Sequence, residues 1–278
     1  MATDDITLQQ AADALGVHYM TAYRYVRHGQ LEARKVDGEW RVSSAALDAF
    51  RAGARRPRVG RGARSAPWAE RMEARLVAGD AAGAWGVVEA AMAAGASPDR
   101  VYTEVISPAL VSIGDRWAGG ELDIASEHRA TAVVQRLIGR LGPHFGRRGR
   151  TRGVVVVGAP AGETHSLVVS MLADLLRGEG WEVSDLGADV PAESFVTAVS
   201  EVDPVAVIIS VTASDSLPAA AHACASLRTH HPETRVVLGG RAVVDERSAL
   251  ELGADAFSAD VDTLASLLAG YSAASRSA

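Results

Sequence analysis

The sequence predicts a multidomain protein, in which a winged helix-turn-helix is followed by a four-helix bundle and then by an α/β domain with a parallel sheet. Three observations predict this order. Residues 6–50 combine short helical patterns with a hairpin, residues 67–145 keep a helical period, and apolar β-branched runs alternate with helices from residue 152. The length of 278 residues suffices for two or three domains. We place the domain boundaries at 1–52, 53–66, 67–148 and 149–272, of which 53–66 is a linker.

The first fifty residues have the pattern of two short helices, a hairpin and a third helix. In ITLQQAADALG the apolar residues recur at helical spacing, and Gly16 ends this helix. HYMTAYRYVRHG forms the second helix. Asp37-Gly38 joins two short β runs, which is a strong signal for a hairpin. SAALDAFRAG then forms a third helix, capped by Ser43 or Ser44.

Charge is distributed unevenly along the chain. Residues 1–65 hold 11 Lys and Arg against 7 Asp and Glu, a balance of +4, whereas the remainder holds 17 against 27, a balance of −10. A basic head on an acidic body indicates that the head binds a polyanion. Residues 51–66 contain Arg, Gly and Pro with few apolar side chains, so we expect a flexible basic linker.

The helix–turn–helix–hairpin order of the head resembles the excisionase/MerR-type winged helix-turn-helix, in which the second helix enters the major groove of DNA. Arg24 is the best candidate for a base contact, because arginine pairs bidentately with guanine. The alternative is a small helical module for protein interaction with a solvated basic face. The candidate DNA-binding residues are His18, Tyr19, Thr21, Arg24 and Tyr25 on the second helix, and Arg34, Lys35 and Arg41 on the hairpin.

The middle of the chain predicts four helices with short connections. Pro67 opens the first helix, Asp80 caps the second, and Gly95 ends it. Ser97-Pro98-Asp99 is typical of a helix start, because it combines an N-cap residue, a proline at the first position and an acid in the first turn. A fourth helix is expected from about Asp123 to Leu141. The natural arrangement of these four helices is a bundle.

The last part of the chain predicts a parallel sheet covered by helices on both faces. Continuous Val and Ile runs such as GVVVVGA and PVAVIISV alternate with helices, for example from His165 to Arg177 and from Glu193 to Val202. Ligands of such sheets bind beyond the carboxyl ends of the strands. The loop after the first strand, Gly162-Glu163-Thr164-His165, therefore lies where a cofactor or metal ligand is expected. Glu163 is close enough in sequence to hydrogen-bond one imidazole nitrogen of His165, which would leave the other nitrogen oriented toward a metal. An acid and a capping histidine at a helix N-terminus explain the same spacing.

The wider pattern resembles the Rossmann-like cobalamin-binding fold, because Ser210 ends the third strand and Gly239-Gly240 follow the fourth. This resemblance implies that His165 is the lower axial ligand of cobalt and that Glu163 orients it. It also implies that Ser210, Gly239 and Gly240 line a channel for the displaced dimethylbenzimidazole tail. Two positions depart from the family pattern: Val168 replaces a glycine, and Thr212 replaces the leucine of an S-x-L motif. Both departures concern the channel rather than the axial ligand.

A second signal lies in the bundle, where Trp117 is followed after nine residues by Glu127-His128. This pattern resembles the light-responsive regulators of the CarH/LitR type. The resemblance implies that adenosylcobalamin is the cofactor. It also implies that Trp117 packs beside the adenosyl group and that Glu127 hydrogen-bonds the ribose of that group. After illumination, His128 is expected to bind cobalt from above. A core tryptophan with a surface Glu-His pair is the alternative.

The combined resemblance implies a regulator without enzymatic activity, which binds operator DNA as a dimer or tetramer with adenosylcobalamin in the dark and releases it on photolysis. A repressor is the expected direction of regulation. Two alternatives remain: a regulator that senses another tetrapyrrole, heme or bilin, alone or beside cobalamin, and a corrinoid methyl-carrier protein. The sequence has no secretory signal, no apolar run of membrane-spanning length and one cysteine, Cys224, which predicts a cytoplasmic protein.

Overall fold

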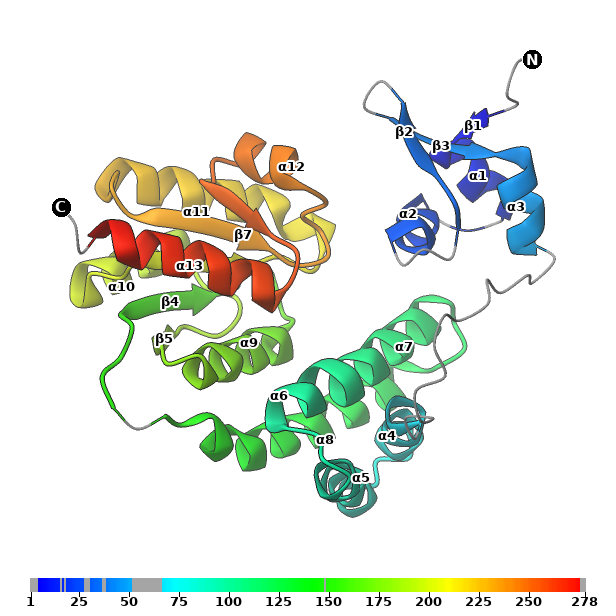
Figure 1. Cartoon of the computed structure of the whole chain (residues 1–278), viewed down its shortest axis with the longest axis horizontal. Coiled ribbons are helices and arrows are strands. Elements are labelled where there is room, and N and C mark those ends of the chain that lie inside the picture. The colour runs from blue at the N-terminus through cyan, green and yellow to red at the C-terminus, as the bar shows by residue number, and fades with distance from the viewer. Residues whose placement is uncertain are drawn as a thin grey trace. The chain divides into compact units, whose positions relative to one another are not determined.

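A computed structural model describes residues 5–15, 17, 19–27, 31–36, 39–51, 67–147 and 149–275. The chain divides into two compact units, residues 1–65 and residues 66–278 (Figure 1). The first unit is the helix-turn-helix, and the second contains both the helical bundle and the parallel sheet. The predicted fold class is therefore confirmed. None of the helices in the described ranges is long and apolar enough to cross a lipid bilayer.

The first unit joins three helices to a small antiparallel sheet. Thr7 and Gln10 exchange side-chain and backbone hydrogen bonds of 2.9 and 3.2 Å, which caps the first helix. The core gathers one apolar face from each helix, including the predicted Leu8, Ala11 and Ala12. A short N-terminal strand was not predicted; it pairs with the second hairpin strand. The elements are β1 (Asp5–Thr7), α1 (Leu8–Leu15), α2 (Tyr19–Arg27), β2 (Arg34–Val36), β3 (Glu39–Ser43) and α3 (Ser44–Arg51). Gly16 and Asp37-Gly38 lie outside the described residues.

The bundle contains the four predicted helices, and its N-caps follow the sequence. The Asp80 carboxylate accepts the Gly83 N–H at 2.8 Å, and the Asp123 carboxylate accepts the Ser126 N–H at 2.7 Å. The third helix was predicted as regular but contains a π-helical stretch, η1. Four of its six residues are buried, namely Val101, Tyr102, Val105 and Ile106. The elements are α4 (Trp68–Val77), α5 (Ala81–Ala93), α6 (Pro98–Arg100), η1 (Val101–Ile106), α7 (Ser107–Ala118), α8 (Ile124–Leu141) and the 3-10 turn η2 (Gly142–Phe145).

The sheet of the second unit has five parallel strands in the order β5-β4-β6-β7-β8. Helices α9 and α13 pack on one face, and α10, α11 and α12 pack on the other (Figure 1). Cys224 of α11 is buried among the apolar side chains of the second face, as predicted. The strands are β4 (Val154–Gly158), β5 (Glu182–Asp185), β6 (Ala206–Ser210), β7 (Arg235–Gly239) and β8 (Ala256–Ser258). The helices are α9 (Ser166–Gly178), α10 (Ala192–Val202), α11 (Leu217–His230), α12 (Glu246–Glu251) and α13 (Val261–Ser275).

Helix α9 connects the bundle to the sheet. Its Leu167 and Met171 belong to the hydrophobic core of the bundle. The Tyr102 hydroxyl, in η1, donates a buried hydrogen bond of 2.8 Å to Asp174 on α9, whose second carboxylate oxygen accepts from Arg177 at 3.0 Å. Burial and the neighbouring Asp174 raise the pKa of Tyr102, so its hydroxyl keeps its proton. The helix that follows the His165 loop is thus fixed to the bundle by both apolar and polar contacts.

Candidate functional site

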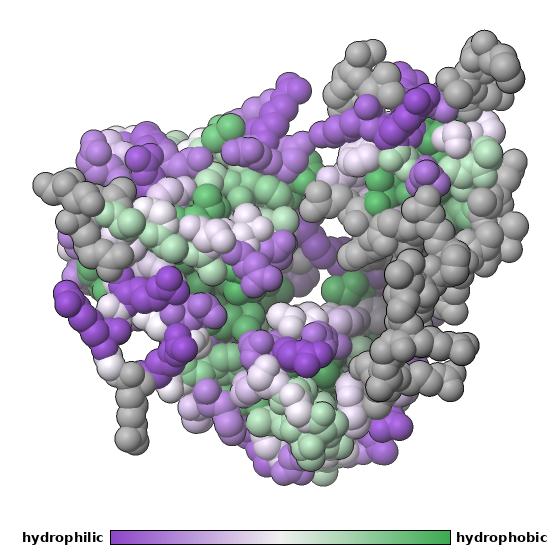
Figure 2. All heavy atoms as spheres, in the orientation of Figure 1, coloured by the Kyte–Doolittle hydropathy of each residue, from purple (hydrophilic) through white to green (hydrophobic). Residues whose placement is uncertain are grey.

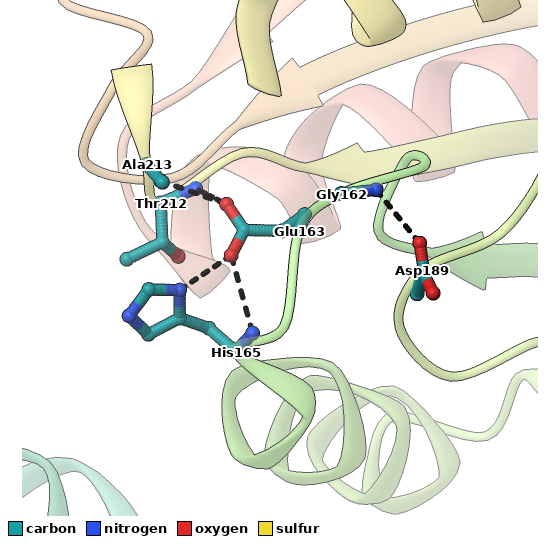
Figure 3. Close-up of polar contacts among 6 residues, drawn as sticks. All are labelled: Gly162, Glu163, His165, Asp189, Thr212 and Ala213. Carbon is teal, nitrogen blue, oxygen red and sulfur yellow. Dashed lines mark hydrogen bonds and ion pairs between the residues drawn. The ribbon is translucent and has the colours of Figure 1, made fainter. Parts of the chain in front are cut away.

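The loop between β4 and α9 places a buried carboxylate at the carboxyl edge of the sheet. Glu163 is only 1% exposed. Its Oε2 accepts the backbone N–H groups of Thr212 and Ala213, both at 2.7 Å, and its Oε1 accepts the His165 N–H at 3.1 Å (Figure 3). The loop after β6 therefore holds the carboxylate, and the carboxylate in turn holds the start of α9.

The His165 imidazole is oriented by the same carboxylate. Its Nδ1 hydrogen-bonds Glu163 Oε1, while half of the side chain is exposed (51%). In Figure 3 the other ring nitrogen, Nε2, points away from Glu163. When Nδ1 carries the proton toward the carboxylate, Nε2 keeps a free lone pair. A histidine held in this way can serve as an axial metal ligand.

The charge state of Glu163 supports this tautomer. Burial alone would raise the pKa of the carboxyl, but hydrogen bonds from Ala213, the His165 imidazole, Thr212 and the His165 N–H together hold that pKa below its usual value. The group is therefore a carboxylate near neutral pH and acts only as an acceptor. Such a partner keeps the proton on Nδ1 of His165 and leaves Nε2 as the nitrogen that can bind a metal.

A third loop fixes the site from the other side. Asp189, which follows β5, accepts the Gly162 N–H at 2.7 Å and donates its own N–H to the Glu163 carbonyl at 2.9 Å. Asp189 has a φ of +57°, in the left-handed region, so it holds a sparsely populated conformation. Sequence reasoning missed Asp189 and Ala213. Ala213 acts through its backbone N–H, which residue type does not reveal. Asp189 follows β5 at a spacing that belongs to no known sequence motif.

The residues expected to line the tail channel lie together at the ends of β6 and β7. Ser210 is buried and pairs with Gly239. A Cβ on Gly239 would lie 2.7 Å from the Ser258 carbonyl oxygen, and one on Gly240, which has a φ of +99°, would lie 2.3 Å from the Val211 carbonyl oxygen. Close approach of neighbouring backbone therefore requires both glycines, independently of any ligand. Their role as a channel stays a prediction.

The two departures from the family pattern differ in their surroundings. Val168 lies on the first turn of α9 and is 37% exposed, so its side chain stands at the surface near His165. Thr212 acts through its backbone N–H, which any residue except proline would supply. The Thr212 position is thus compatible with the Glu163 contact, whereas the Val168 side chain occupies surface that a glycine would leave open.

Several helices of the second unit expose large apolar side chains. Trp117, in the last turn of α7, is 47% exposed and therefore does not serve the bundle core. Figure 2 shows hydrophobic residues on the parts of the bundle and of the sheet domain that border one another. An apolar surface of this kind marks a place where a ligand or partner packs. The large apolar residues that are exposed in the described ranges are Val111 and Trp117 on α7, Ile124 on α8, Val168 on α9 and Leu250 on α12.

Glu127 and His128 lie near the start of α8 and, like Glu163 and His165, form a glutamate–histidine pair. The Glu127 carboxylate hydrogen-bonds His128 Nδ1 at 2.6 Å and accepts from the Thr131 hydroxyl at 2.9 Å. The His128 side chain is 71% exposed, with Nε2 as its other nitrogen. Both histidines therefore have a glutamate on Nδ1. The predicted contact of Glu127 with a ribose would require it to exchange these partners.

The donors present fit a metal that is already held by a macrocycle. In the described parts of the chain, no group of three or more His, Cys, Asp or Glu side chains could hold a metal ion by itself. Cobalt in a corrin ring needs only one axial donor from the protein. His165 presents such a donor at the surface, and the exposed Val168 follows it on the first turn of α9. Heme iron would accept the same donor.

The predicted DNA-binding surface is described in part. His18 and the side chains of Thr21 and Arg24 lie outside the described residues. Tyr19 stacks on Tyr23 at 6.4 Å, and Tyr25 packs on Phe50 at 4.8 Å between ring centres. On the hairpin, Lys35 is exposed beside Trp40, Arg41 is partly buried, and Arg34 is exposed but bonded to Asp5 at 2.7 Å. The hairpin therefore presents basic side chains, and Tyr25 contributes at least part of its ring to the core.

Three family models match this chain: a helix-turn-helix domain over residues 6–55, and B12 binding domain models over residues 68–141 and 153–268. The family models and the fold thus agree on a helix-turn-helix unit followed by a body that matches the B12 binding domain models.

The chain is similar to the HTH-type transcriptional repressor CarH of Myxococcus xanthus, with 35% identity over 150 residues, which cover 54% of this chain and 49% of that protein. It is also similar to a trimethylamine corrinoid protein of Methanosarcina barkeri, with 29% identity over 121 residues, 42% of this chain and 56% of that protein. The chain thus spans about half the length of the curated relatives that it matches. Among solved structures, the Methanosarcina barkeri monomethylamine corrinoid protein has the same fold, with a TM-score of 0.62 and 19% identity, over 72% of this chain and 95% of that one.

Proposed function

We propose that this chain is a light-responsive transcriptional repressor, which binds operator DNA with adenosylcobalamin in the dark and releases it after photolysis. The observation that supports this proposal best is the half-exposed His165, whose Nδ1 is held by the buried Glu163 in a chain that also carries a helix-turn-helix domain. The name of the Myxococcus xanthus relative supports repression as the direction of regulation.

When bound, adenosylcobalamin supplies a cobalt–carbon bond that light cleaves. The side chains of this protein bind and orient the cofactor around that bond. His165 offers Nε2 from the sheet side, and Glu163 holds its tautomer. Trp117 would offer its exposed ring to the adenosyl group from the bundle side. A ligand that fills the surface between bundle and sheet domain stabilises one packing of the two, and loss of its upper group favours another.

His128 would be a second donor to cobalt in this proposal. Because Glu127 binds its Nδ1, its Nε2 would be available to hold the metal in the illuminated protein. In the dark, the repressor assembles as a dimer or tetramer and binds its operator without performing catalysis. After illumination, the assembly separates and the DNA is released.

A corrinoid methyl-carrier protein is the second candidate, because several relatives are corrinoid proteins and one solved corrinoid protein has the same fold. The helix-turn-helix match and the Glu127-His128 pair favour the regulator. A regulator of another tetrapyrrole is the third candidate, since Val168 stands where the family has glycine. Under the second candidate a partner enzyme consumes a bound methyl group; under the third the purified protein carries a heme or bilin spectrum.

The experiment that tests the proposal compares DNA binding before and after light. The full chain is purified in darkness with adenosylcobalamin, bound sequences are selected from a pool of random duplexes, and fluorescence anisotropy then measures the affinity for the selected duplex. We expect tight binding in the dark, loss of binding on illumination, and weak binding at all times for His165→Ala. Dark and illuminated affinities that agree, with cobalamin bound, would contradict the light switch.

A further inference from the structure

A strongly basic hollow lies at the opposite edge of the sheet from His165. It has a volume of about 690 Å³ and is lined by the connector before β4 and by the turn between α9 and β5. These segments lie at the amino ends of the strands, whereas the His165 loop follows the carboxyl end of β4. The hollow is therefore separate from the candidate cobalamin site.

The charge of the hollow is opposite to that of the surrounding body. Residues 66–278 carry 17 basic and 27 acidic side chains, a balance of −10. The lining residues described here include four arginines, Arg147, Arg150, Arg152 and Arg177, against two glutamates, Glu179 and Glu182. Three of the four arginines belong to one stretch of six residues, 147–152. Such a concentration on an acidic body attracts anions locally.

Two of the exposed arginines meet over one glycine. A methyl group on Gly180 would lie 3.8 Å from Arg147 Nη1 and 3.7 Å from Arg152 Cδ, so both side chains lie over this glycine. Arg152 is 3.6 Å from a Glu179 carboxylate oxygen, and Arg177 has a carboxylate partner of its own. Among the described residues, neither Arg147 nor Arg150 has a carboxylate partner. Unpaired positive charges on one short segment favour binding of an anion.

The aromatic ring of Trp181 helps to fix one of the arginines. Trp181 lines the hollow and is 97% buried, and Arg152 lies 5.4 Å from the centre of its ring. A guanidinium group that packs on an aromatic ring keeps its direction. Phosphate oxygens accept hydrogen bonds from guanidinium groups.

We propose that this hollow binds a phosphate group, held by Arg147 and Arg150 beside the ion-paired Arg152. The phosphate comes either from a free metabolite or from the backbone of the DNA that the helix-turn-helix binds. Both sources present the same tetrahedral oxyanion to the arginines. The site goes beyond the proposed light response, because none of its residues contacts the His165 loop in the described contacts.

The test uses the full chain as purified and two variants of equal charge change. Arg147→Gln/Arg150→Gln removes two arginines from the hollow, and Arg100→Gln/Arg247→Gln removes two that are exposed elsewhere and paired with glutamates. Calorimetric titration with inorganic pyrophosphate reports the free source. Binding of a random-sequence duplex at several salt concentrations reports the DNA source.

If the phosphate is free, pyrophosphate binding weakens by about tenfold or more in the hollow variant and by less than about twofold in the control. If it belongs to DNA, the salt dependence of duplex binding falls by about two counterions in the hollow variant alone. Equal losses in both variants, or no loss in either assay, would overturn the proposal. Absorption spectra of the same samples measure cobalamin binding. A failure of the cobalamin proposal is therefore distinguished from a failure of the phosphate proposal.

Discussion

Replacement of Glu163 by glutamine tests the role of the buried carboxylate most informatively. Thr212 and Ala213 both donate N–H groups to Oε2, so the amide must place its oxygen there. Its NH₂ group then faces His165. There it repels the His165 backbone N–H, since both groups are donors, and it donates a hydrogen bond to Nδ1. The proton of the imidazole is thereby driven to Nε2, which loses the lone pair that a metal needs.

The magnitude follows from the four hydrogen bonds. One bond to a charged acceptor, from the His165 N–H, is lost, at about 1.5–3 kcal/mol, and the two at Oε2 change from charged to neutral acceptors, at about 1 kcal/mol each. Burial of a neutral amide costs less than burial of a carboxylate and offsets part of this loss. We expect Glu163→Gln to lower the free energy of unfolding by about 2–3 kcal/mol and the affinity for cobalamin by about 10–100-fold.

Urea denaturation and cobalamin titration measure both effects, with Glu233→Gln, an exposed glutamate, as the control of equal charge change. The pH dependence adds a signature. Because the folded pKa of Glu163 lies below its ordinary value of 4.5, its contribution to stability is present above that value and is lost as the pH falls through the folded pKa. The stability difference between wild type and Glu163→Gln should therefore shrink in acid below about pH 4.5. Equal stability and equal cobalamin affinity of the two variants at neutral pH would refute this reasoning.

Three further predictions concern the bundle contact, the glycine pair and the DNA. Tyr102→Phe leaves a buried carboxylate on α9 without one of its donors and should lower stability by about 1–3 kcal/mol in urea denaturation, whereas an unchanged midpoint would show that the contact is not formed. Gly240→Ala forces a Cβ to 2.3 Å from the Val211 carbonyl oxygen at a positive φ and should lower the melting temperature strongly, while Gly270→Ala, which meets nothing within 4 Å, should leave it equal or higher. Arg24→Ala should weaken binding to a selected duplex by about 1–3 kcal/mol and leave random DNA almost unaffected; equal losses on both would place the base contact elsewhere.

Much of the fold was predictable because local signals and packing agree in this chain. Asp80 caps the helix that it was expected to cap, the fourth helix begins directly after Asp123, about where it was expected to begin, and the apolar runs of β4 and β6 are buried on both faces of a parallel sheet. The strand β1 was missed because three residues carry too little periodicity, and its pairing with β3 depends on a tertiary contact. The π-helical stretch η1 was missed because its sequence reads as an ordinary helix.

The candidate site was predictable only where side chains carry it. His165 and Glu163 stand two residues apart after a strand, so their contact could be expected. The hydrogen bonds from the N–H groups of Thr212 and Ala213 to that carboxylate could not be expected, because almost any residue type supplies a backbone N–H. Asp189 was missed for a related reason: its role comes from a left-handed turn that meets the loop of Gly162 in space. A glycine pair, conversely, is ambiguous, because close backbone packing requires Gly239 and Gly240 whether or not a ligand passes.

The central claim, that His165 binds cobalt through Nε2, is tested most directly by electron paramagnetic resonance of bound cobalamin after one-electron reduction to cobalt(II). The unpaired electron of cobalt(II) couples to the nucleus of the axial nitrogen and splits each cobalt line. Protein grown with ¹⁵N-labelled histidine and loaded with unlabelled cobalamin should give doublets, and His165→Ala prepared in the same way should lose them. Triplets in the labelled wild-type protein would show that the benzimidazole of the cofactor itself is the axial ligand and would contradict the account.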